Sequence, residues 1–133
     1  MNRHIVTFAF PLLIVLFSQC GNDLRDEVLT LQVPPIKWGC ECPQWVRTDQ
    51  LTGNPDSTFE HCFYIEAADS LAELPDTIGY TGDIVELTGS FYEKEGIGEG
   101  YSRRNYAPEA PIFRYTGYKI IESHYRESQF PDE

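Results

Sequence analysis

The pattern of apolar and polar positions predicts a chain built from short strands. Apolar runs that alternate with polar residues, or that are rich in β-branched and aromatic residues, occur at 28–33, 44–48, 59–67, 84–92 and 112–125. Successive side chains of a strand point to opposite faces of a sheet, so such runs are typical of half-buried strands. In the third run, this alternation assigns one face to Phe59, His61, Phe63 and Ile65.

The segments between these runs contain little that predicts helix. Residues 68–74 suit either two turns of helix or a short strand, and Pro75 ends both. Gly89 lies inside the fourth run, where a glycine often marks a bend or a bulge. Residues 93–111 form a loop of nineteen residues that is rich in glycine and charge. Loops of this length in compact domains are usually functional or mobile.

Five short strands separated by turn residues favour a sandwich or a small barrel. The stretch from Gly82 to Gly89 resembles a strand of OB-fold barrels, in which a glycine bend lets one strand serve two sheets. The expected fold is therefore all-β, a small five-stranded OB-like barrel over residues 28–126, followed by a polar tail at 127–133.

The first twenty residues have the organisation of a secretory leader. Arg3 precedes an apolar run from Ile5 to Phe17, which is shorter than the roughly 20 residues needed to span a bilayer. The residues before Cys20 resemble a bacterial lipobox, in which the cysteine becomes the lipidated first residue, although Gln19 and Phe17 depart from the usual residues. We expect a lipoprotein signal peptide at 1–19 and a polar tether at 20–27. The alternative is a secreted protein in which Cys20 is not lipidated.

Several short motifs resemble those of small outer-membrane lipoproteins of the Bacteroidota that have OB-like domains and uncharacterised functions. They are the Cys-x-Cys-Pro motif from Cys40, the Cys-Phe-Tyr-Ile-Glu strand from Cys62, and the stretch from Phe113 to Tyr118. The resemblance covers most of the chain after the leader. It implies a location at the outer membrane, with the acylated Cys20 inserted in the lipid bilayer, and it implies no activity.

The charge balance restricts the classes of partner. The chain has 21 acidic residues against 10 Lys and Arg, and its net charge is −11. Binding to nucleic acid needs clustered basic residues, and an anionic membrane surface attracts the same residues. We therefore expect no nucleic-acid partner.

Three cysteines follow Cys20, namely Cys40, Cys42 and Cys62. The envelope is oxidising, so a disulfide is expected. Cys40 and Cys42 would lie on the same side of an extended chain, so we favour a bridge from Cys42 to Cys62 over one from Cys40. The alternative is a metal site of the Cys₃His type, made of Cys40, Cys42, His61 and Cys62, whose spacing differs from that of structural zinc sites. Taken alone, His61 is expected to be a hydrogen-bonded core residue.

The long loop contains the one local basic and aromatic cluster of this acidic chain, made of Tyr101, Arg103, Arg104 and Tyr106. Such residues in a loop favour binding, with an envelope protein or a polysaccharide as the partner. The alternative is a mobile, solvated hairpin. The sequence contains no hydrolase motif, so we expect a binding or structural protein without catalytic activity and without a cofactor.

Overall fold

The computed structural model describes residues 21–78 and 83–122. The predicted signal peptide at 1–19, Cys20 and the predicted tail at 127–133 lie outside these ranges. Within them, no helix has the length and apolar character needed to cross a membrane.

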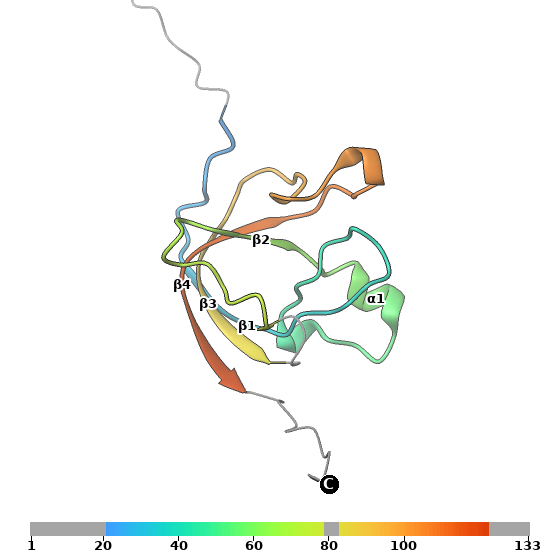
Figure 1. The fold of residues 1–133 in the computed structure, drawn as a ribbon, viewed down its shortest axis with the longest axis horizontal. Helices are drawn as coiled ribbons and strands as arrows, with labels where there is room; N and C mark the ends of the chain where they lie inside the picture. Colours follow the sequence, from blue (N-terminus) through green and yellow to red (C-terminus); the bar gives the residue numbers. More distant parts are fainter. Residues whose placement is uncertain (1–20, 79–82, 123–133) are drawn as a thin grey trace, which may run out of the picture.

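One sheet of four strands organises the described residues (Figure 1). The strands are β1 Leu29–Val33, β2 Tyr64–Ala67, β3 Ile84–Phe91 and β4 Ile112–Glu122, and their order in the sheet is β1-β3-β4-β2. The pairs β1–β3 and β3–β4 are antiparallel, whereas β2 lies parallel to β4. The named helical elements are short: α1 Pro55–Phe59 and the 3-10 turns η1 Thr48–Gln50 and η2 Arg103–Asn105.

The prediction of a strand-rich fold with little helix is confirmed, but the expected closed five-stranded barrel is wrong for the described residues. Strands β1 and β2 form the two edges of an open sheet. The predicted strand at 44–48 is reduced to isolated bridges, in which Trp45 pairs with Pro35 on one side and Phe63 on the other. Pro34 and Pro35 have no backbone N–H to donate, so a longer ladder does not form on that side.

The predicted strand at 59–67 is correct only in its second half. The side chain of Asn54 accepts hydrogen bonds from the backbone N–H groups of Asp56 and Ser57, and Pro55 occupies the first turn. This cap and the proline favour helix α1, which ends at Phe59. The alternation of faces therefore begins only at Phe63, and His61 is exposed rather than buried in the core.

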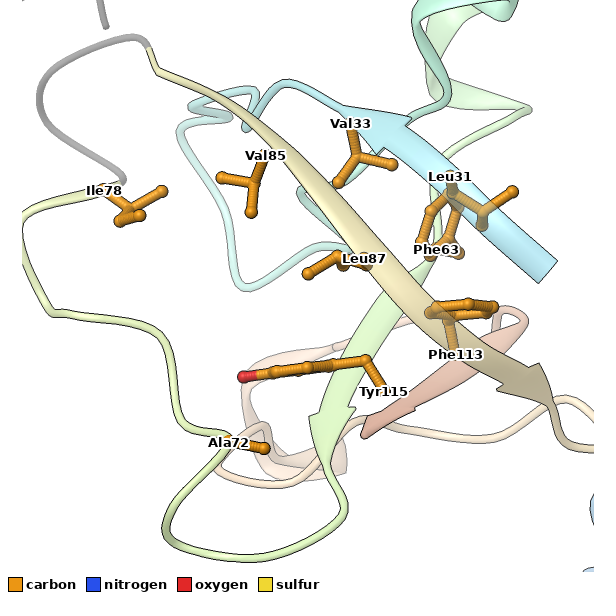
Figure 2. Close-up of a cluster of buried hydrophobic side chains, with 9 residues drawn as sticks. All are labelled: Leu31, Val33, Phe63, Ala72, Ile78, Val85, Leu87, Phe113 and Tyr115. Atoms are coloured by element: carbon orange, nitrogen blue, oxygen red, sulfur yellow. The ribbon is translucent and has the colours of Figure 1, made fainter. Parts of the chain in front are cut away.

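One face of the sheet carries the main hydrophobic core (Figure 2). Side chains from β1, β3 and β4 converge there with residues from the segments around β2, and the buried members are Leu31, Val33, Phe63, Ala72, Ile78, Val85, Leu87, Phe113 and Tyr115. Phe63, Phe91 and Phe113 meet edge to face, with ring centroids 4.9 to 6.2 Å apart. This geometry is favourable for aromatic pairs and adds to the burial of their area.

Gly89 marks an irregularity in β3, as the sequence predicts. The pairing register between β3 and β4 shifts between Thr88 and Gly89. A Cβ atom at Gly89 would lie 2.0 Å from the backbone oxygen of Arg114. Only glycine permits this close approach of the two strands.

A second, smaller cluster packs on the opposite face of the sheet. Tyr64 and Ile112 are paired across β2 and β4, each next in sequence to a residue of the main core, so their side chains point to the other face. Ala110 completes the buried part of the cluster, and Tyr92 and Tyr101 pack against it. The loop 93–111 therefore covers this face and is attached to it by aromatic side chains.

Candidate functional site

The long loop is closed on itself near its two ends and is attached to β2 through Tyr64. Gly96 and Ala110 exchange two backbone hydrogen bonds, of 3.0 and 2.9 Å. Nearer the middle, the Tyr64 hydroxyl donates to the Pro108 carbonyl oxygen at 2.8 Å. Gly98 passes so close to the Tyr64 ring that a Cβ atom there would lie 2.7 Å from Cγ of the ring. Tyr64 is thus the residue of β2 around which the loop folds.

Tyr101 packs against the same residue. Its ring centroid lies 4.7 Å from that of Tyr64, and the two planes are tilted by 53°. Burial raises the pKa of both phenols, and the negative charge of Glu41 adds to the rise in each. The predicted binding residue Tyr101 is therefore half-buried, and its packing against Tyr64 stabilises the loop.

The turn η2 presents the remaining predicted residues. The side chain of Ser102 accepts a hydrogen bond from the backbone N–H of Arg104 at 3.2 Å and caps the turn. Tyr106 ends it in the left-handed conformation, with φ 61°. A left-handed tyrosine is uncommon, and here it directs the side chain outward, where it is 93% exposed.

The two arginines of η2 have different roles. Arg103 forms an ion pair with Glu109 across the loop. Arg104 is exposed, and its side chain forms no hydrogen bond or ion pair with the described residues. Of the four residues predicted as a binding cluster, the structure leaves Arg104 and Tyr106 free to meet a partner.

Glu41 joins this loop to the cysteine-containing segment, a connection that the sequence analysis missed. Its Oε1 accepts a hydrogen bond from Asn105 Nδ2 at 2.6 Å, and its Oε2 accepts one from the Ser102 backbone N–H at 3.4 Å. Carboxylate acceptors make stronger hydrogen bonds than neutral ones. The only signal in the sequence was the position of Glu41 between two cysteines. The segment around Glu41 and the loop cluster at 101–106 are therefore in direct contact.

The cysteine pairing differs from the prediction. Cys40 and Cys42 form a disulfide, and Cys62 is a free, buried thiol, so the expected Cys42–Cys62 bridge is wrong. The chain bends at residues 39–41, which brings the two Cα atoms to 5.3 Å, compared with about 6.6 Å for residues two apart in a strand. The prediction assumed an extended chain at Cys40–Cys42, and the chain is bent there instead.

Cys62 is buried close to the end of α1. It is 3% exposed, and its thiol donates to the Thr58 carbonyl oxygen at 3.4 Å. Burial raises the pKa of the thiol, and the nearby Trp38 indole opposes the rise only in part. The indole N–H is buried and forms no regular hydrogen bond within the described chain. Cys62 is therefore a neutral thiol at neutral pH.

The alternative metal site is not formed. Cys40 and Cys42 are joined to each other, and His61 is exposed while Cys62 is buried. Throughout residues 21–78 and 83–122, no group of three or more His, Cys, Asp and Glu side chains is placed to hold a metal ion. The Cys₃His interpretation is therefore not supported.

A shallow groove of about 290 Å³ lies between the end of α1 and the long loop. Phe59 and three prolines contribute apolar surface, and Glu60, Glu95 and Glu109 bring carboxylates to its lining. The side of the loop nearest to α1 is therefore acidic, whereas Arg104 on η2 carries an unpaired positive charge.

Comparisons of the chain with protein-family models, with curated proteins and with solved structures gave no match. The resemblance to small envelope lipoproteins therefore stays a prediction from the sequence. What the site does has to follow from the chemistry of its own residues.

Proposed function

We propose that this protein is a lipid-anchored, non-enzymatic binding protein of the cell envelope, and that it binds a partner protein through the η2 turn. The observation that carries the proposal is the placement of Tyr106. Its side chain is 93% exposed, yet the turn that presents it is capped by Ser102 and bonded to Glu41. Because the backbone of the turn is already held in place, it loses little entropy when a partner binds the Tyr106 side chain.

Tyr106 and Arg104 are the residue types that dominate binding energy in protein interfaces. Tyrosine and arginine are enriched among the few residues whose truncation costs most. A complementary surface would offer an apolar pocket for the Tyr106 ring and a carboxylate for Arg104. Arg103 is already paired with Glu109, so it stabilises the loop and is not available to a partner.

The charge of the chain favours a protein partner over an acidic polysaccharide. With a net charge of −11, the molecule would repel a polyanion that extends along its surface beyond the η2 turn. One free arginine does not offset that repulsion. A folded partner needs only local complementarity, because surface charges separated by more than a Debye length, about 8 Å at physiological ionic strength, are largely screened.

The lipid anchor supports the same function. A thioether-linked lipid on Cys20 together with an N-acyl chain would hold the domain at the membrane, since more than one chain gives stable anchoring. Growth of the host with an alkyne-labelled palmitate tests this step. We expect label on the full-length chain and none on Cys20→Ala, and a labelled Cys20→Ala chain would refute it.

Site-specific photo-cross-linking in the producing cells tests the binding surface. A benzoyl-phenylalanine replaces Tyr106 in one strain and Leu71, which is 94% exposed, in a control strain. We expect one discrete cross-linked protein species at position 106, lost in an Arg104→Glu background and absent at position 71. Equal cross-linking at both positions would contradict the proposal, and a carbohydrate-positive smear at position 106 would replace the protein partner with a polysaccharide.

A further inference from the structure

The disulfide encloses a single residue, and that residue holds the candidate binding loop. Glu41 is the only residue between Cys40 and Cys42, and its carboxylate accepts hydrogen bonds from Asn105 and Ser102. Glu41 is also close enough to Tyr64 and Tyr101 for its charge to act on both phenols. The carboxylate therefore lies where η2 meets the aromatic support of the loop.

The direction of the Glu41 side chain depends on the bend in the chain at residues 39–41. The disulfide keeps the flanking Cα atoms 5.3 Å apart, and with the cross-link open the segment has access to extended conformations with a separation of about 6.6 Å. A cross-link stabilises a conformation largely by removing alternatives from the open chain. Opening it raises the entropic cost of placing the Glu41 carboxylate against Asn105.

Opening of the disulfide would act first on η2. The Ser102 backbone N–H and the Asn105 side-chain amide would no longer have a fixed carboxylate acceptor. The local hydrogen bonds within the turn would remain, such as the 3.0 Å bond from the Asn105 N–H to the Ser102 carbonyl. A single turn is weak on its own, because short helices depend on tertiary contacts. We expect η2 to loosen while the sheet stays folded.

We propose that the Cys40–Cys42 disulfide is a redox control on the order of the 101–106 loop and that Glu41 transmits its state. The use of this control, to set the affinity for a partner, rests on the proposed function. The coupling itself, from disulfide to Glu41 to η2, does not.

The chemistry needs a dithiol reductant, such as a thioredoxin-type envelope oxidoreductase. Cys40 is exposed and Cys42 is buried, so a thiolate of the reductant attacks Cys40 Sγ and displaces the Cys42 thiolate, which takes a proton. The second thiol of the reductant gives up its proton and attacks the mixed disulfide at the reductant sulfur. Cys40 leaves as a thiolate and is protonated, and the reductant ends as a disulfide. Two electrons and two protons pass to the protein.

Hydrogen exchange on the full mature chain tests the coupling, with dithiothreitol as the probe reductant. Peptides that cover residues 102–107 report on η2, and peptides from β3 report on global folding. We expect reduction to speed exchange at 102–107 by about tenfold or more, with β3 unchanged. Glu41→Ala should do the same without reductant, and reduction should add little to it, because both changes remove one interaction.

Three outcomes would overturn this inference. If reduction leaves exchange at 102–107 unchanged, the disulfide does not control the order of the loop. An equal rise in the exchange rate of β3 would show that the disulfide stabilises the whole fold and not η2 in particular. A full effect of reduction in Glu41→Ala would exclude Glu41 as the transmitter. Hydrogen exchange needs no ligand. Failure of cross-linking at position 106 would therefore contradict the proposed function without affecting the exchange result.

Discussion

Glu41 Oε1 accepts a hydrogen bond of 2.6 Å from Asn105 Nδ2, across 64 residues of sequence. This contact joins the disulfide turn to the candidate binding loop and makes one site of two segments that look independent in the sequence. Another long-range hydrogen bond of the loop, from Tyr64 to Pro108, ties it to β2. Together they place Tyr106 and Arg104 on a supported turn.

Asn105→Ala is expected to destabilise the fold slightly by removing the donor to Glu41. We predict a loss of about 0.5–1 kcal/mol in the free energy of unfolding, which is below the values of about 1.5–3 kcal/mol typical of a bond to a charged group because Asn105 is exposed. Urea unfolding measures the change. Arg104→Ala is the matched control, because its side chain has no partner among the described residues. Equal effects of the two substitutions would contradict the role of the Glu41 contact.

Tyr64→Phe keeps the ring that packs against Tyr101 and removes the hydroxyl that donates to Pro108. The expected cost is about 1 kcal/mol, because the Pro108 carbonyl is left without this donor. Tyr106→Phe makes the same chemical change on a fully solvated side chain and should change stability by less than about 0.5 kcal/mol. If both substitutions behave alike in urea unfolding, the Tyr64 hydroxyl does not hold the loop.

Non-reducing peptide mapping should recover a Cys40–Cys42 disulfide and an unmodified Cys62. In the folded chain, Cys62 should react with iodoacetamide far more slowly than a free thiol, because burial keeps it neutral and shielded. Urea should restore its reactivity. A Cys42–Cys62 linkage would contradict the bend at 39–41, and rapid native labelling of Cys62 would contradict its burial.

Alkaline pH should destabilise the protein through its buried phenols. Among the described tyrosines, burial is the first cause of a raised pKa in Tyr64, Tyr92, Tyr101 and Tyr115. A pKa that is higher in the folded state gives stability that is complete below the unfolded value, about 10, and is lost as the pH rises through the folded value. The Tm should therefore fall steeply above about pH 10, and less steeply in Tyr64→Phe.

The absorbance of phenolate gives an independent check of the same prediction. The phenols of Tyr64, Tyr92, Tyr101 and Tyr115 should ionise at higher pH in the folded protein than in urea, because burial raises their pKa. A single titration of all tyrosines near their ordinary pKa in the folded protein would contradict the assigned burial.

Local pattern predicted the parts of the fold that depend on neighbouring residues. The strands β1, β3 and β4 follow from alternation, and the irregularity at Gly89 follows from a glycine inside a strand. Helix α1 also had a local signal, since Asn54 and Pro55 form a cap, but the alternation at 59–65 competed with it. Periodicity does not show where a strand begins when a capped turn precedes it.

The site depends on longer-range geometry, which the pattern does not contain. The disulfide follows from the bend at residues 39–41, and an extended chain would have favoured Cys62 as the partner. The contact between Glu41 and Asn105 needs the loop to be folded against Tyr64 first. The sequence located the loop and its four residues, but the division into supporting residues, Tyr101 and Arg103, and free ones, Arg104 and Tyr106, required the structure.

The order of the 101–106 loop is the central claim, since a mobile hairpin would not present Tyr106 as a prepared binding surface. Backbone amide order parameters from ¹⁵N relaxation measure it directly, with residues 84–91 of β3 as the internal reference. We predict values for residues 102–106 close to those of β3, near the level of about 0.85 for rigid backbone. Values for these residues below about 0.6, with β3 still rigid, would contradict the account.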